Sequence, residues 1–188
     1  CWTGELWNRR KNGELYAELL TVSDVRDASG STQHYVGLFS DITPMKEHQR
    51  QLEDMAHFDA LTGLPNRVLL ADRLRQAISQ ARRRNVLMAL VYLDLDGFKA
   101  INDSHGHEAG DDLLIAVSKG LKDALRVGDT LARLGGDEFV AILVDLSTVA
   151  ECETVLCRLL QAAARPVDIR GHMLRVSASL GVTLFPID

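Results

Sequence analysis

Residues 1–42 alternate apolar and polar side chains over short runs that turn residues separate. The run Gly4–Val25 alternates around the turn Lys11–Gly13, and the stretch Asp27–Thr32 separates it from the run Gln33–Ile42. Alternation with a period of two, broken by such turns, predicts antiparallel strands. About three strands of this kind have little apolar surface to bury alone, so we expect them to complete a larger sheet.

The pattern changes at Thr43. Thr43 is a suitable N-cap, Pro44 suits a first helical position, and no helix breaker interrupts Met45–Phe58. Met45, Leu52 and Met55 are apolar, and together with His48 they follow one another at steps of three or four residues. The stripe is typical of a short coiled coil, but two heptads do not distinguish it from a single linker helix, so both interpretations stay open.

From Asp59 onward, helical and strand patterns alternate. Gly63 and Pro65 mark a turn. The predicted helices cover residues 68–84, about 108–125 and about 148–164. The predicted strands cover residues 86–96, 130–133, 139–144, 166–169 and 173–185, with a hairpin turn at 170–172. This order predicts an α/β (α+β) fold with one central sheet and helices packed on it, and we expect strand 86–96 to be covered on both faces.

Composition and charge narrow the class of protein. The chain is 46% hydrophobic and 25% charged, which is typical of globular domains, and its net charge of −5 argues against binding a nucleic-acid polymer. Cys152 and Cys157 lie five apart on a predicted helix and point to different sides, so we expect free thiols in a reducing cytoplasm. No apolar run is long enough to span a bilayer, so we expect no membrane contact within this chain. A membrane anchor elsewhere in a longer parent protein stays open.

Two acidic pairs carry the candidate chemistry. Asp94 and Asp96 end an apolar strand and, being two residues apart, face the same way. Asp137 and Glu138 follow a glycine pair at the start of another strand. If the strands are neighbours, four carboxylates gather and repel unless cations neutralise them. Hard oxygen ligands suit Mg²⁺ bound together with substrate phosphates, so the pattern indicates a nucleoside triphosphate, without a G-x-x-x-x-G-K-[S/T] loop.

The segment between the acidic pairs holds candidate substrate ligands. Lys99 could offset phosphate charge, and Asn102 with Asp111 offers an amide and a carboxylate that match the edge of guanine. The alternative for each is a turn residue or a helix cap. His105 and His107 lie in an expected glycine loop without a third ligand, which favours a structural role over metal binding.

Five motifs in order resemble the diguanylate cyclase catalytic domain, named GGDEF after the sequence that stands intact at 135–139. The others are D-A-L-T-G-L-P-N-R at 59–67, D-L-D-G-F-K-A-I-N-D at 94–103, G-H-E-A-G-D at 106–111 and R-V-G-D at 126–129. The resemblance implies a palm/nucleotidyl-cyclase-like domain over 59–188 that lacks the family's last helix and strand. Residues 1–43 are similar to the C-terminal part of a PAS sensor domain, with 44–58 as a linker helix.

The resemblance also implies a reaction and its residues. Two domains of a homodimer would each bind GTP and condense the pair into cyclic di-GMP, with Mg²⁺, or Mn²⁺ instead, as cofactor. The carboxylates of Asp94 and Asp137 and the carbonyl of Leu95 would hold metal, with Asp137 as proton acceptor and Glu138 assisting. The remaining residues would contact the nucleotide: Asn102 and Asp111 at guanine, Lys99 and His107 in support, and Gly135 and Gly136 at the phosphates.

The R-V-G-D motif implies product inhibition. Arg126 and Asp129 would bind cyclic di-GMP on a surface away from the catalytic site; the alternative is a turn that ends a helix and carries a local ion pair. An alternative function for the whole chain is a noncatalytic receptor for cyclic di-GMP or GTP. Many such receptors have lost the acids, and their presence here favours the enzyme.

Overall fold

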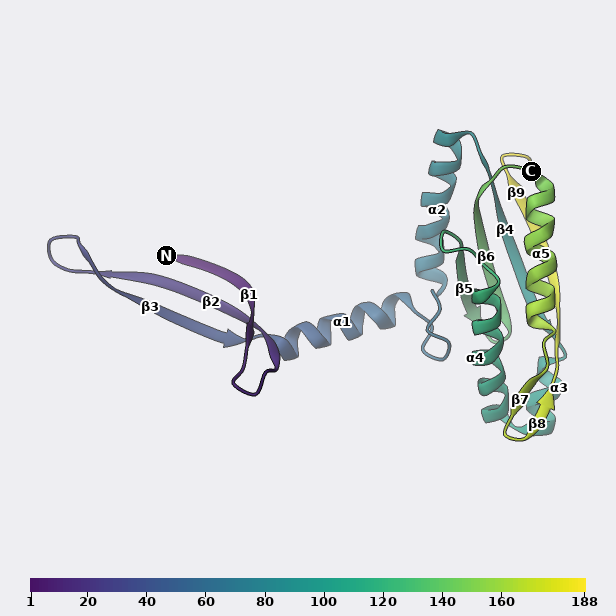
Figure 1. The fold of residues 1–188 in the computed structure, drawn as a ribbon, viewed down its shortest axis with the longest axis horizontal. Coiled ribbons are helices and arrows are strands. Elements are labelled where there is room, and N and C mark those ends of the chain that lie inside the picture. The colour runs from purple at the N-terminus through teal and green to yellow at the C-terminus, as the bar shows by residue number, and fades with distance from the viewer. The chain divides into compact units, whose positions relative to one another are not determined.

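The computed structural model describes residues 1–188 and divides into two compact units, residues 1–54 and 55–188 (Figure 1). Each is described by itself. No helix in the structure combines the length and the apolar character that crossing a membrane requires.

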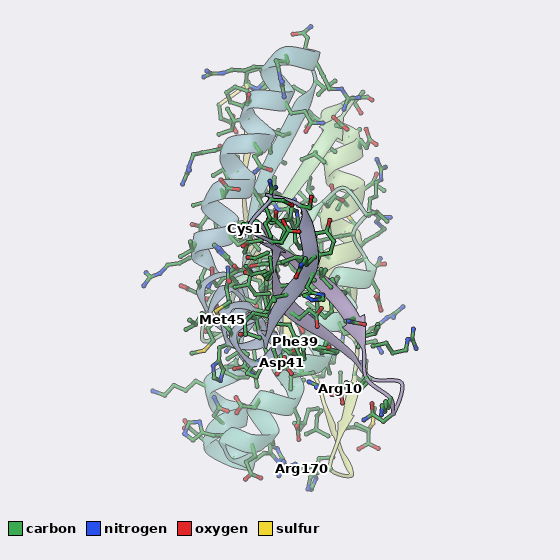
Figure 2. All side chains as sticks on the ribbon, turned by 90° about the vertical axis from the view of Figure 1, so that its left-hand side faces the viewer. Cys1, Arg10, Phe39, Asp41, Met45 and Arg170 are labelled. Atoms are coloured by element: carbon green, nitrogen blue, oxygen red, sulfur yellow. The ribbon has the colours of Figure 1, made fainter.

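The first unit is a three-stranded antiparallel sheet in the order β1 (Trp2–Arg9), β2 (Leu15–Arg26), β3 (Thr32–Asp41). The predicted strands are therefore confirmed. Tight turns join them at Gly13 and Gly30, whose φ angles of +92° and +85° favour glycine. Apart from Ala17 and Glu18 no side chain of the sheet is fully buried. Trp7 is exposed, as is Phe39, which Figure 2 labels.

Helix α1 (Thr43–His57) is attached to this sheet at its first residue. The hydroxyl of Thr43 accepts a hydrogen bond from the N–H of Ala17 at 2.9 Å, and Asp41 accepts one from the N–H of Thr43 at 2.9 Å. Hydrogen bonds from Thr43 and the ion pair with Arg10 hold the pKa of Asp41 at about 2 (Figure 2). No residue of α1 is buried, and the stripe of Met45, Leu52 and Met55 is exposed.

The second unit is built on a four-stranded antiparallel sheet. Its strand order is β5 (Thr130–Gly135), β6 (Glu138–Leu146), β4 (Leu87–Asp96), β9 (Ser177–Phe185). The helices are α2 (Arg67–Arg84), α3 (Phe98–His105), α4 (His107–Asp123) and α5 (Val149–Ala163), and a small hairpin joins β7 (Val167–Ile169) to β8 (His172–Leu174). The predicted central sheet with packed helices is confirmed.

The alternation of side chains along β4 produces two hydrophobic cores. Val91, Leu93 and neighbours on the same face pack with α4 and α5, whereas Met88 on the opposite face packs with α2 (Figure 1). The prediction that both faces of this strand are covered is correct only for its first half. Tyr92 is 52% exposed, and Asp94 and Asp96 are exposed, so one face is open at the end that carries the acids.

Two regions of the second unit differ from the predictions. Residues 98–105 form helix α3, bounded by Gly97 and Gly106 with φ angles of +80° and +84°, so His105 and His107 lie on two helices rather than in a glycine loop. The predicted strand 173–185 is broken after β8 and resumes at Ser177 as β9.

The two cysteines of α5 have the predicted arrangement. Cys152 is buried and Cys157 is exposed, and both are free thiols.

Packing of α4 on the sheet is a testable source of stability. Leu121 is fully buried in the core against α5, so Leu121→Ala is expected to lower the free energy of unfolding by about 2–5 kcal/mol in urea titrations. Ile115→Ala on the exposed side of the same helix is the control, with an expected loss below about 1 kcal/mol. Equal losses for the two variants would contradict the assignment of the buried face.

Candidate active site

Two carboxylates lie opposite each other where β4 ends and β6 begins, and a third stands in the adjoining turn. Asp94 lies directly opposite Glu138 in the antiparallel pairing of β4 with β6, so their side chains share one face of the sheet, and both are exposed. Asp137 is half-buried in the two-residue turn that joins β5 to β6. The structure thus brings together the acids of two motifs that stand more than forty residues apart.

The fourth acid, Asp96, is held by the neighbouring edge strand. Its carboxylate accepts hydrogen bonds from the hydroxyls of Ser177 at 2.7 Å and Ser179 at 2.8 Å, both on β9. These two hydrogen bonds hold the pKa of Asp96 below its ordinary value. Asp94 and Asp96 face the same way, as predicted, but Asp96 is engaged with β9 rather than with the other acids.

One arginine side chain, Arg133, holds the glycine turn by hydrogen bonds to its backbone. Gly135 and Gly136 have φ angles of +143° and +54°, conformations that side chains other than glycine's rarely adopt. The guanidinium of Arg133, only 9% exposed, donates from Nε and Nη2 to the carbonyl of Gly136 at 2.9 and 2.8 Å. The turn that carries Asp137 is therefore anchored at the residue before it.

The same guanidinium binds the opening motif of the domain. Nη1 of Arg133 donates to Asp59 Oδ1 at 2.9 Å, across 74 residues of sequence. Burial raises the pKa of Asp59, but hydrogen bonds from Thr62 and the ion pair with Arg133 outweigh it and keep the pKa below its ordinary value. No sequence pattern predicted this role of Arg133; the signals for it were an arginine beside the glycine pair and an aspartate in the opening motif.

The two candidate guanine ligands lie on adjacent helices. Asn102 of α3 is half-buried and lies over Gly110 of α4, where a Cβ atom would overlap the side-chain oxygen of Asn102. Asp111 follows Gly110 and is exposed. The absence of a Cβ atom at Gly110 therefore leaves room for the Asn102 side chain on the helix that carries Asp111, and an alanine there would displace Asn102.

Lys99 and His107 are exposed at the starts of α3 and α4, and no hydrogen bond or ion pair joins either to the acids.

The β7–β8 hairpin is attached to helices α3 and α4. His172 packs against His105 with ring centroids 5.3 Å apart. Arg170, labelled in Figure 2, lies in the turn of this hairpin. It pairs with Glu108 at 2.5 Å and Asp112 at 2.9 Å.

The R-V-G-D segment forms a turn at the other end of β6. Asp129 accepts hydrogen bonds from the N–H groups of Arg126 at 3.0 Å and Val144 at 3.1 Å. Arg126 is exposed and pairs with Glu151 at 2.8 Å, so a helix-ending turn and an ion pair are both present, with Glu151 rather than Asp129 as the partner. Val144 lies six positions after Glu138 on β6, which places the turn about 20 Å from the acids.

The donor set near the acids consists of oxygen atoms. The carboxylates of Asp94, Asp137 and Glu138 and the main-chain carbonyl of Leu95 fit a hard divalent cation such as Mg²⁺. No group of three or more His, Cys, Asp or Glu side chains is arranged to hold a metal ion by itself. Ligands from a substrate would have to complete such a site.

Comparison with known proteins identifies relatives of the second unit. Residues 56–188 match the family model described as diguanylate cyclase, GGDEF domain. The chain is 46% identical over 146 residues to the bifunctional diguanylate cyclase/cyclic di-GMP phosphodiesterase MucR of Pseudomonas aeruginosa, covering 78% of this chain and 21% of MucR. It is 42% identical over 137 residues to the cyclic di-GMP phosphodiesterase NbdA of the same organism, covering 73% and 17%. The chain thus spans about a fifth of the length of these relatives.

Solved structures show the same architecture. A sensory box/GGDEF family protein from Caulobacter crescentus aligns with a TM-score of 0.67 at 40% identity, covering 69% of this chain and 84% of that one. The coiled coil and GGDEF domain of DgcB from the same organism, in complex with c-di-GMP, aligns with a TM-score of 0.67 at 26% identity, covering 76% of each chain. The predicted fold class is therefore confirmed; no comparison identifies residues 1–43 as a PAS part.

The anchoring of the glycine turn can be measured by stability. Arg133→Met leaves the Asp59 carboxylate and the Gly136 carbonyl without their partner, so we expect the free energy of unfolding to fall by about 3 kcal/mol in urea. Arg84→Met, which breaks the exposed ion pair with Asp145, is the matched control, with an expected loss of about 0–1 kcal/mol. A loss for Arg133→Met no larger than for the control would disprove the anchoring role.

Proposed function

This chain belongs to the diguanylate cyclase (GGDEF domain) family, and we propose that it condenses two GTP molecules into cyclic di-GMP and two pyrophosphates. The observation that supports this most is the intact acidic turn: Asp137 and Glu138 stand at the end of a sheet beside Asp94, on an open face. A noncatalytic receptor would need a binding surface but not these carboxylates.

Divalent metal ions are the general cofactors of this family, and Mg²⁺, with Mn²⁺ as the alternative, is our proposal for this chain. Asp94 and Asp137 would hold the ions through their carboxylates, and Leu95 through its carbonyl. Bound there, the ions would supply charge neutralisation for the triphosphate and polarisation of the α-phosphoryl group. The oxygen-only donor set and its exposure support this assignment.

Guanine recognition is assigned to the contact between α3 and α4. The Asn102 amide and the Asp111 carboxylate can together match the acceptors and donors of a guanine edge. The packing of Asn102 on Gly110, the residue before Asp111, supports this role. Lys99 and His107 support the nucleotide with charge and hydrogen bonds. The backbone of Gly135 and Gly136, which carries no side chains, lets the phosphates approach closely.

The reaction requires two copies of the domain that face each other. Asp137 accepts the proton of a 3′-hydroxyl, Glu138 assists, and the 3′-oxygen attacks the α-phosphorus of the GTP on the partner domain while pyrophosphate leaves. The 3′-hydroxyl of the second nucleotide then attacks the α-phosphorus of the first in the same way, and loss of the second pyrophosphate closes the ring. We propose that the exposed stripe of α1, Met45, Leu52 and Met55, contributes to pairing of the copies.

Regulation is proposed at two places. Residues 1–43 would be the C-terminal part of a PAS sensor, with 44–58 as its linker to a catalytic domain at 59–188, and the alternating sheet of the first unit supports this division. Arg126 and Asp129 would bind cyclic di-GMP as an inhibitor, and the exposure of Arg126 supports this role. GTP as substrate would place the domain in the cytoplasm.

Removal of the proposed base tests the catalytic assignment. In the full-length protein, Asp137→Asn is expected to reduce cyclic di-GMP formation from GTP by about 10²–10⁴-fold, because it removes both a metal ligand and the proton acceptor. Asp145→Asn, at the other end of β6, is the matched control and is expected to retain activity. Product formed by Asp137→Asn at the wild-type rate would refute the assignment. A wild type that binds nucleotide without turnover would instead favour the receptor.

The inhibitory site has its own test. Arg126→Ala removes a charged donor from the proposed product site, so we expect the inhibition constant for cyclic di-GMP to rise at least about tenfold, as expected from the loss of one charged hydrogen bond. Glu151→Gln breaks the ion pair of Arg126 but keeps the guanidinium, and is expected to preserve inhibition. Equal inhibition of wild type and Arg126→Ala would leave only the structural role of this turn.

A further inference from the structure

Asp96, the second acid of the D-L-D motif, has both carboxylate oxygens engaged by one edge strand. Oδ2 accepts from the hydroxyl of Ser177 at 2.7 Å, and Oδ1 accepts from the hydroxyl of Ser179 at 2.8 Å. Each serine hydroxyl has a single hydrogen to donate, and each gives it to Asp96. The hydrogen bonding of this carboxylate is thus directed to β9.

The order of the strands shows towards which side of β4 these hydrogen bonds pull Asp96. The order is β6-β4-β9, so β9 and β6 flank β4 on opposite sides. Asp94 lies opposite Glu138 on β6 and opposite Ser179 on β9, whereas Asp96 lies opposite Ser177. Ser179 therefore reaches diagonally to Asp96 rather than directly across to Asp94. Its hydroxyl and that of Ser177 draw the Asp96 carboxylate towards β9, away from the strand that carries Glu138.

Asp94 differs from Asp96 although both are exposed on the same face. No hydrogen bond or ion pair within the chain engages the Asp94 side chain, which leaves its carboxylate available to a ligand. An ion bound by Asp94 and Asp137 keeps positions for water and phosphate oxygens only if further carboxylates stay out of its coordination sphere. A third or fourth carboxylate would occupy those positions and bind the ion without nucleotide.

We propose that Ser177 and Ser179 hold Asp96 off the metal position, so that the D-L-D motif contributes one carboxylate ligand, Asp94, and Asp96 is a positioning residue. The inference rests on the metal site of the proposed function. It assigns to β9 the task of keeping the coordination sphere open for the triphosphate. The serines thereby couple metal affinity to the presence of nucleotide.

Direct measurement of metal binding tests this assignment without turnover. Mn²⁺ binding to the full-length protein is followed by electron paramagnetic resonance in the presence of a GTP analogue with an α,β-methylene bridge. Asp94→Asn is expected to weaken Mn²⁺ binding by about tenfold or more, whereas Asp96→Asn is expected to leave it close to wild type. An asparagine at 96 can still hydrogen-bond to both serines, so the strand pairing is retained.

The outcomes separate this inference from the proposed function. Equal weakening by Asp96→Asn and Asp94→Asn would show that Asp96 is a ligand and would overturn the inference alone. A wild type that binds no Mn²⁺ would overturn the inference together with the metal assignment. The expected binding pattern without cyclic di-GMP formation would support the inference and contradict the proposed reaction.

Release of Asp96 provides the converse test. The double variant Ser177→Ala/Ser179→Ala is expected to bind Mn²⁺ about tenfold more tightly than wild type in the absence of nucleotide, because Asp96 is then free to turn towards Asp94. Adding Asp96→Asn to the double variant is expected to restore the wild-type affinity. Ser79→Ala on the exposed side of α2 is the control and is expected to change nothing. Unchanged affinity in the double variant would contradict the proposal.

Discussion

The hydrogen bonding of the buried Arg133 guanidinium is the interaction on which the candidate site depends. It links the carbonyl of Gly136 to the carboxylate of Asp59, so the turn that carries Asp137 cannot shift without leaving a buried charge unpaired. The opening motif is itself joined to the end of α1, because Asn66 donates to the carbonyls of His57 and Ala56 at 2.9 Å. Hydrogen bonds therefore connect the last turn of this helix, through residues 59–66, to the acidic turn.

The sheet of the second unit is asymmetric in a way that suits a binding site. Helices α4 and α5 cover one face along β4, whereas α2 packs on the opposite face near Met88 and leaves the Asp94 end open (Figure 1). The buried half of the strand holds its backbone in register, and the open half presents carboxylates to solvent. The packed half and the half with exposed carboxylates are thus adjacent on one strand. The serines of β9 bind Asp96, whereas Asp94 lies opposite Glu138 of β6.

Periodicity and motif spacing predicted the central sheet and the main helices, because these follow from local alternation. The meeting of Asp94 with Glu138 was expected only if their strands were neighbours, and the pairing of β4 with β6 shows that they are. Helix α3 was missed because it has only eight residues between two glycines, too few for a helical period to stand out. The role of Arg133 and the hydrogen bonds of Asp96 were missed for another reason. Both depend on contacts between residues more than seventy positions apart, which no local pattern reports.

The central claim is that two GTP molecules are joined into one product by this domain in its full-length protein. The most direct measurement incubates that protein with Mg²⁺ and an equal mixture of unlabelled and ¹³C-labelled GTP, and identifies the products by mass spectrometry. The account predicts cyclic di-GMP in unlabelled, half-labelled and fully labelled forms in binomial proportion. Unchanged GTP from a folded, dimeric protein, or products that never combine the two labels, would contradict it.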